Sequence, residues 1–173
     1  SRVTASIPGV EAGPPIVAWS CFLRRPDGDT EERSQTASER KRMSESQIHP
    51  TAVVHPSAEI GAGCRIGPFA VLEEDVVLGD GCSVQSHAVI KRYTRLGQGN
   101  QVFETAVLGG VPQDLKYEGG RSYLFVGDGN VFREGVTINR STEPDGVTRI
   151  GRHCFFMTCS HVAHECVVGD HVV

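Results

Sequence analysis

The stretch IGAGCRIGPFAVLEEDVVLGDGCSVQSHAVI, residues 60–90, decides the fold of this chain. An aliphatic or aromatic apolar residue stands at every sixth position of it, and the same phase continues over most of the sequence. Such a fixed period is typical of an array of short structural repeats and not of an amphipathic helix, whose period is 3.6. The periodic positions are Ile48, Val54, Ile60, Ile66, Leu72, Leu78, Val84, Ile90, Leu96, Val102, Leu108, Val126, Phe132, Ile138, Ile150, Phe156, Val162 and Val168.

Small residues follow most of these positions after four residues, and glycine often follows directly, as in Gly61, Gly67 and Gly79. This rhythm predicts a two-residue strand and a tight turn, repeated, because glycine permits the positive φ that such turns need. Three units would close a coil of 18 residues, and coils would stack at about 4.8 Å. We therefore expect an all-β parallel β-helix, and its likeness to known hexapeptide repeats implies a left-handed one.

Two parts of different character divide the chain. Residues 1–42 are rich in Arg, Glu, Ser, Pro and Gly and show no repeat, so we expect a disordered segment or a non-native N-terminal extension. The first methionine is Met43, which suggests that translation starts there. Residues 43–173 form the predicted β-helix. Its period is interrupted at 109–125 and 139–149, where we expect loops.

Composition excludes several classes of protein. The formal net charge is −4, and no basic stripe indicates nucleic-acid binding. No apolar run approaches the roughly 20 residues of a membrane-spanning helix, so we expect no integral membrane segment. Four of the six cysteines occupy the small position of the repeat, which predicts packed thiols in a reducing cytoplasm. They are Cys64, Cys82, Cys154 and Cys166.

Candidate chemistry lies where the repeat is unusual. The first loop contains Gln113, Asp114 and Lys116, which can donate and accept hydrogen bonds to a polar ligand. The segment SHVAHE places His161 and His164 around one turn, next to a glutamate. An imidazole of ordinary pKa can take a proton from a hydroxyl, and a neighbouring carboxylate can hold its tautomer. From spacing alone, a catalytic base, a zinc ligand and a solvent-facing side chain all remain open.

With these residues in view, the sequence resembles the acyl-ACP:UDP-N-acetylglucosamine O-acyltransferase family, which performs the first step of lipid A synthesis. The resemblance covers about residues 46–173 and is most specific in the loop and in the histidine segment. The stretches that carry it are IHPTAVVHPSAEIGAGCRIGPFAV, VPQDLKYEGG, FREGVTINRST and SHVAHECVVGD.

The resemblance implies roles for individual residues. His164 matches the general base, which deprotonates the glucosamine 3-hydroxyl for attack on the thioester of (R)-3-hydroxyacyl-ACP. His161 matches a residue that positions substrate. Gln113 and Asp114 match contacts to the sugar nucleotide, and Lys116 matches a basic residue near phosphate or the acyl carrier protein.

The family also implies a homotrimer with sites between subunits, and no metal or cofactor. Its members continue into further coils and a C-terminal helical domain, so we expect this chain to be an N-terminal fragment with little or no activity alone. Asn139 stands where several members carry His. Because residues 43–173 are acidic, with 10 Lys and Arg against 15 Asp and Glu, an acidic carrier must dock on a local patch. Arg133 and Arg140 are the candidates for that patch.

Three other readings remain. A zinc enzyme similar to γ-class carbonic anhydrases would use His161 and His164 as ligands, with His87 as a poor third. A non-catalytic hexapeptide solenoid would use the coil as an assembly surface. A related N-acyltransferase family carries an additional N-terminal domain, for which residues 1–42 are too short and too polar.

Overall fold

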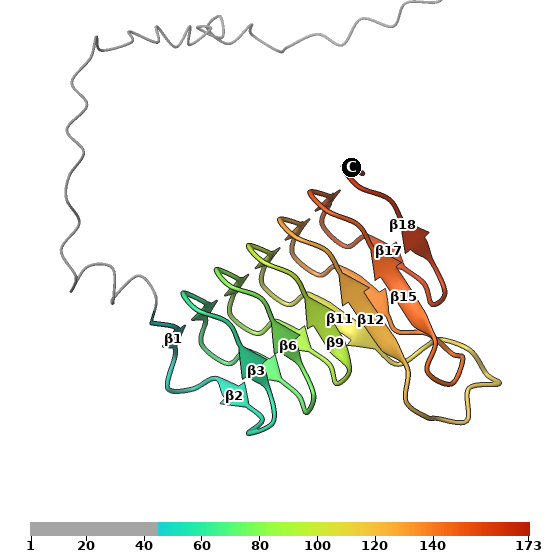
Figure 1. Cartoon of the computed structure of the whole chain (residues 1–173), viewed down its shortest axis with the longest axis horizontal. Coiled ribbons are helices and arrows are strands. Elements are labelled where there is room, and N and C mark those ends of the chain that lie inside the picture. The colour runs from blue at the N-terminus through green and yellow to red at the C-terminus, as the bar shows by residue number, and fades with distance from the viewer. Residues whose placement is uncertain (1–44) are drawn as a thin grey trace, which may run out of the picture. The chain divides into compact units, whose positions relative to one another are not determined.

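The computed structural model describes residues 45–173, which form a coil of 18 short strands in three parallel sheets (Figure 1). The predictions made for residues 1–42 lie outside this part. Each turn of the coil contributes one strand to each sheet. The predicted fold class, a left-handed parallel β-helix of hexapeptide repeats, is confirmed.

We call the three sheets A, B and C. Sheet A contains β1 (Gln47–Ile48), β4 (Arg65–Ile66), β7 (Ser83–Val84), β10 (Gln101–Val102), β13 (Val131–Phe132) and β16 (Phe155–Phe156). Sheet B contains β2 (Val53–Val54), β5 (Val71–Leu72), β8 (Val89–Ile90), β11 (Val107–Gly110), β14 (Thr137–Asn139) and β17 (His161–Val162). Sheet C contains β3 (Glu59–Ile60), β6 (Val77–Leu78), β9 (Thr94–Leu96), β12 (Tyr123–Val126), β15 (Val147–Ile150) and β18 (Val167–Val168).

The periodic apolar residues fill the inside of the coil. Those of the middle coils, from Ile66 to Phe156, are at most 8% exposed. Val54, Ile60, Val162 and Val168 are only partly buried, because the first and last described coils are each covered on one side. Stacking therefore creates a core that no single repeat could bury.

The register of the ladders survives both interruptions of the period. Ile48 pairs with Ile66, one ordinary coil later. Val102 pairs with Phe132 across the first loop, and Phe132 pairs with Phe156 across the second. The additional residues therefore leave the coil as loops, and the register of β11 against β14 shifts only locally, between Leu108 and Gly110, where the first loop begins.

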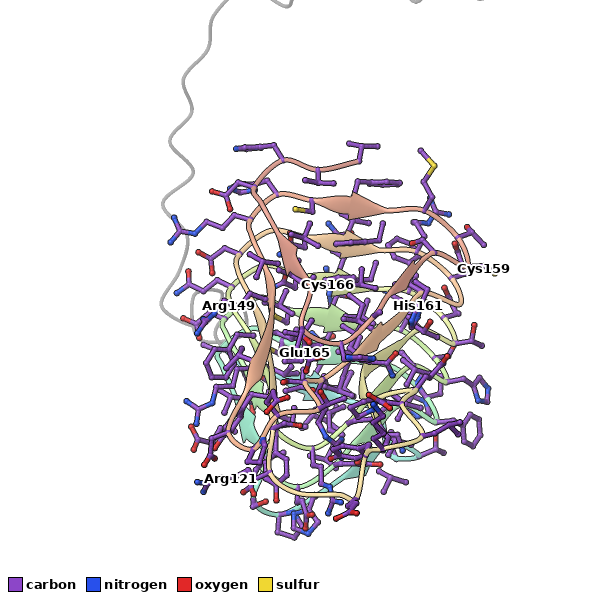
Figure 2. The ribbon with its side chains drawn as sticks, turned by 90° about the vertical axis from the view of Figure 1, so that its right-hand side faces the viewer. Arg121, Arg149, Cys159, His161, Glu165 and Cys166 are labelled. Carbon is purple, nitrogen blue, oxygen red and sulfur yellow. The ribbon has the colours of Figure 1, made fainter. Side chains whose placement is uncertain are left out.

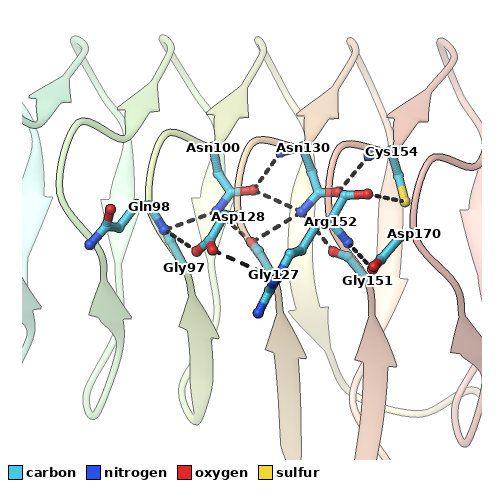
Figure 3. Close-up of polar contacts among 10 residues, drawn as sticks. All are labelled: Gly97, Gln98, Asn100, Gly127, Asp128, Asn130, Gly151, Arg152, Cys154 and Asp170. Carbon is cyan, nitrogen blue, oxygen red and sulfur yellow. Dashed lines mark hydrogen bonds and ion pairs between the residues drawn. The ribbon is translucent and has the colours of Figure 1, made fainter.

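The corner where sheet C hands the chain to sheet A, here the C–A corner, is held by a ladder of polar side chains (Figure 3). Asn130 donates to the carbonyls of Gly127 and Gly151 at 3.1 and 3.0 Å, and its Oδ1 accepts from the backbone N–H of Cys154 at 2.8 Å. Asn100 donates in the same way to Gly127. These amides are completely buried, and hydrogen bonds within the corner offset their loss of water.

Three of the predicted packed thiols belong to the same ladder. Cys64, Cys82 and Cys154 are buried, and each Sγ donates to a glycine carbonyl of the next coil at 3.1–3.2 Å. Burial raises the pKa of the Cys82 thiol to about 11. Cys166 is only half-buried. The prediction of packed thiols is thus confirmed for three residues, and the small position at this corner also requires a hydrogen-bond donor.

Candidate functional site

All of the unusual segments of the sequence emerge at one edge, the B–C corner, where sheet B hands the chain to sheet C. The first loop, 111–122, connects β11 to β12, and the second, 140–146, connects β14 to β15. The histidine segment continues through 163–166 from β17 to β18. Because successive strands of each sheet pair in parallel, these connections lie on three consecutive coils, and both loops project from one side of the coil in Figure 1.

His164 and Glu165 form a hydrogen-bonded pair at this corner. The Nδ1 atom of His164 contacts Oε2 of Glu165. A carboxylate only accepts hydrogen bonds, so Nδ1 must carry the proton. Neutral His164 therefore keeps a lone pair on Nε2, which is the form that a general base needs.

Glu165, which is labelled in Figure 2, is itself held by hydrogen bonds from the second loop. Its Oε1 accepts hydrogen bonds from the hydroxyl of Ser141 at 2.6 Å and from the hydroxyl and backbone N–H of Thr142. Burial alone would raise the pKa of this carboxyl, but the hydrogen bonds from Ser141, His164 and Thr142 lower it to about 2. Glu165 is therefore an anion at neutral pH, and it can stabilise a positive charge on the imidazole.

His161 lies on the outer face of β17. Its Nδ1 is 2.7 Å from the hydroxyl of Thr137, its register partner on β14. The ring is exposed, so this contact orients it without hiding it. His161 thus lies on the outer face of sheet B, and His164 lies in the turn that follows the same strand.

The first loop is ordered around Asp114. Its Oδ1 accepts from the backbone N–H of Lys116 at 2.9 Å, and its carbonyl accepts from the N–H of Tyr117. Gln113 and Lys116 are exposed. Within residues 45–173, no hydrogen bond or ion pair joins Gln113, Asp114 or Lys116 to His164. The loop and the histidine pair therefore share the corner without touching.

Two residues at the base of the loops have positions that the sequence did not predict. Asn139 is buried, and its side-chain amide donates to the carbonyl of Val111, so it anchors the first loop. Arg140 is only 2% exposed. The prediction that Arg140 offers an exposed docking charge is therefore wrong. Arg133, the other candidate, forms a bidentate ion pair with Glu134. The signal available in the sequence was that Asn139 and Arg140 directly follow Ile138, where the period breaks.

The described residues offer no ready-made metal centre. Between residues 45 and 173, no three His, Cys, Asp or Glu side chains lie close enough to hold an ion. Nor does this part of the chain contain a helix long and apolar enough to cross a membrane.

Comparison with known proteins supports one family. The profile described as "Bacterial transferase hexapeptide (six repeats)" matches residues 44–73 and 57–92. A curated protein of Akkermansia muciniphila, named acyl-[acyl-carrier-protein]--UDP-N-acetylglucosamine O-acyltransferase, is 55% identical over 120 residues. A protein of the same name from an Anaeromyxobacter species is 57% identical over 124 residues. The chain belongs to this acyltransferase family.

Solved structures agree with this assignment. LpxA from Acinetobacter baumannii superposes with a TM-score of 0.70 and 41% identity, over 72% of this chain and 48% of that one. The UDP-N-acetylglucosamine acyltransferase LpxA from Bacteroides fragilis gives a TM-score of 0.70 and 42% identity, over 72% of this chain and 49% of that one. The two curated matches cover 69% and 71% of this chain. The chain spans about half the length of the curated relatives that it matches, 46% and 48% of the first two.

Proposed function

We propose that the protein transfers an (R)-3-hydroxyacyl chain from acyl carrier protein to the 3-hydroxyl of UDP-N-acetylglucosamine, the first step of lipid A synthesis. The observation that carries this proposal is the His164–Glu165 pair, oriented with Nε2 as the acceptor, on the edge from which the loop containing Gln113–Lys116 projects. The names of the relatives supply the substrate classes.

In this reaction, Nε2 of His164 removes the proton of the sugar hydroxyl as its oxygen attacks the thioester carbonyl carbon. The carbonyl oxygen gains negative charge, and the bond to sulfur then breaks. The imidazolium gives its proton to the departing thiolate, which leaves as the free thiol of the carrier protein. The anionic Glu165 stabilises the imidazolium between these steps. Gln113 and Asp114 would contact the sugar nucleotide, Lys116 its phosphates or the carrier, and His161 would position the acceptor.

We further propose that the active species is a homotrimer with sites between subunits, acting in the cytoplasm without metal or cofactor. Leu115, at the tip of the first loop, is completely exposed in the single chain. A large apolar residue in that position is typical of a contact with another subunit. Sedimentation equilibrium tests the assembly. A homotrimer should have three times the mass of the chain, and a monomer would contradict the proposal.

A chimera tests the reaction. In the chimera, residues 45–173 replace the matching part of the Akkermansia muciniphila relative, and that relative supplies the rest of its own sequence. We expect transfer from 3-hydroxyacyl-ACP to UDP-N-acetylglucosamine, and His164→Ala should lower kcat by about 10²- to 10⁴-fold. His153, which stacks on His171 at the C–A corner, provides the matched control, and His153→Ala should leave kcat unchanged.

Full activity in the His164→Ala chimera would contradict the assigned base. Metal analysis distinguishes the proposed acyltransferase from a zinc enzyme. We expect transfer to be unaffected by a chelator, whereas stoichiometric zinc with hydration of carbon dioxide would favour the carbonic anhydrase-like reading. A chimera without transfer activity that still binds partner proteins would favour the solenoid reading.

A further inference from the structure

Arg140 is a buried charge that has no counter-ion in the part of the chain that the structure describes. Its side chain is 2% exposed, and one guanidinium nitrogen, Nη1, donates to the carbonyl of Gly109 at 3.2 Å. Its Nε has no hydrogen-bond partner. Among residues 45–173, no carboxylate lies within ion-pairing distance of this guanidinium. The compensation that a buried arginine normally finds is therefore missing among residues 45–173.

An arginine keeps its positive charge throughout the physiological pH range, so burial cannot neutralise it by removing a proton. A buried charge is normally retained where a partner of opposite sign offsets its lost hydration. Arg140 lines a groove that opens to solvent, so such a partner can reach it from outside. An anion is therefore the ligand that the charge requires.

The walls of this groove are mostly apolar. It has a volume of about 490 Å³, within the range of small-molecule sites, and runs along the outer face of sheet B under the start of the first loop. Its apolar residues are Val53, Val71, Leu72 and Val111, and its polar residues other than Arg140 are His55, Glu73, Glu74, Lys91 and Arg92.

The two carboxylates of the groove are already neutralised. Glu73 pairs with Lys91 at 2.7 Å, and Glu74 pairs with Arg92 at 3.0 Å. Both pairs lie at the rim, where the side chains are 32–45% exposed. Arg140 is thus the lining residue whose charge no neighbour balances. The groove therefore presents one unpaired cation, Arg140, beside an aliphatic surface.

We propose that this groove binds an anionic single-chain amphiphile, with its carboxylate or phosphate head on Arg140 and its aliphatic chain along Val53 and Val71. None of its lining residues belongs to the catalytic or substrate-contacting set proposed above. The groove lies on the coils that precede the His164–Glu165 pair. The site therefore goes beyond the proposed reaction and does not depend on it.

Calorimetric titration of the full chain tests the site, with decyl phosphate, decanoate, decanol and inorganic phosphate as probes. We expect both anionic amphiphiles to bind, the tighter one identifying the preferred head, and decanol and inorganic phosphate to bind at least about tenfold more weakly. Arg140→Gln should weaken decyl phosphate at least about tenfold. Arg133→Gln, which removes a surface arginine paired with Glu134, should not.

A second pair of variants keeps the test independent of folding at Arg140. Val71→Gln should weaken decyl phosphate, whereas Val89→Gln, at the matching outward position of the next strand but outside the groove, should not. Equal affinity for inorganic phosphate and decyl phosphate would overturn the amphiphile. Absence of amphiphile binding, together with a loss of oligomer mass in Arg140→Gln, would overturn the site and assign the charge to a second copy of the chain.

Discussion

The C–A and B–C corners of one coil treat their polar side chains in opposite ways. At the C–A corner, Asn100 and Asn130 are buried and their amides are used within the ladder. At the B–C corner, Asn139 leaves its Oδ1 without a partner and Arg140 leaves its Nε without one. The asparagine amides at the C–A corner thus have hydrogen-bond partners, whereas beside the B–C corner two buried polar atoms have none.

The difference arises because the regular parts of the β-helix repeat from one coil to the next, whereas the inserted loops do not. Where each coil repeats the one before it, a donor always finds the equivalent carbonyl one step further, and the ladder closes on itself. An inserted loop breaks that repeat, because its neighbours have no equivalent segment. Polar groups beside an insertion are then available to substrates, ligands or other subunits.

One glycine with positive φ lies at the C–A corner and another lies at the end of β11, just before the B–C corner, and alanine at these two positions should give the largest difference in stability. A Cβ on Gly109, in β11, would lie 2.0 Å from Oγ1 of the buried Thr94, whereas a Cβ on Gly99, at the C–A corner, would meet nothing within 4 Å. We expect Gly109→Ala to lower the free energy of unfolding by about 3 kcal/mol and Gly99→Ala by about 1 kcal/mol.

Urea unfolding of both variants measures this difference. Thr94→Ala should restore about half of the loss in Gly109→Ala, because it removes the atom that the new Cβ would meet. Equal losses for the two glycines, or no coupling with Thr94, would contradict the proposed close packing.

Two buried asparagines give the next contrast. Asn130→Ala should lower the free energy of unfolding by about 2–3 kcal/mol, because the N–H of Cys154 and the carbonyl of Gly151 lose their side-chain partner. Asn139→Ala removes one hydrogen bond, to Val111, and should cost about 1 kcal/mol. Thermal and urea unfolding of both variants measure the two losses in the free energy of unfolding. A larger loss for Asn139→Ala than for Asn130→Ala would contradict the prediction.

Glu134 and Glu165 have similarly lowered pKa values, so comparing their variants distinguishes an effect on catalysis from an effect on stability. Hydrogen bonding to Arg133 lowers the pKa of Glu134 to about 2, the same value that Glu165 reaches with Ser141, His164 and Thr142. Glu165→Gln should reduce acyl transfer in the chimera at least about tenfold, because the imidazole loses its anionic partner. Glu134→Gln should leave transfer unchanged.

The acid stability of the same variants provides a check on the two pKa values. A lowered pKa contributes stability above the ordinary value of 4.5, and this contribution is lost as the pH falls through about 2. Either substitution should therefore flatten the fall in stability over that interval. Equal losses of transfer in both variants would show that Glu165 acts only through the fold.

The smallest expected effect concerns thiol chemistry. Burial raises the pKa of Cys82 to about 11, so roughly a thousandth of it is thiolate at pH 8. Cys159 is exposed. Iodoacetamide followed by mass spectrometry should label Cys159 and leave Cys82 unmodified in the native protein. Labelling of Cys82 at the rate of Cys159 would contradict a closed C–A corner.

The sequence predicts the strands well because a six-residue period leaves few alternatives. The shared corner of the two loops and the histidine segment was not predicted, although all three follow the same position of the 18-residue coil, after Leu108, Ile138 and Val162. Asn130 was missed as a ladder residue although it stands four positions after Val126, where the count for the small position would have found it. His153 and His171, 18 residues apart, stack as their spacing predicts.

The environment of single polar atoms could not be predicted from spacing. The burial of Arg140 depends on the carbonyl of Gly109 and on the path of the first loop. Both belong to the preceding coil, so the local sequence does not reveal them. The hydrogen bonds from Ser141 and Thr142 to Glu165 likewise join an inserted loop to a regular turn of the next coil, which the spacing does not predict. The roles of Gln113, Asp114, Lys116, His161 and His164 remain predictions from the resemblance.

The ladder of sheet A keeps its register across both loops, and this has an evolutionary consequence. Each strand is aligned by its neighbours above and below and not by the length of chain between them. Segment 111–122 can therefore be lengthened, shortened or exchanged between relatives while the scaffold stays the same. The B–C corner is in this sense an exchangeable part, through which one coil can acquire new specificities without having to fold anew.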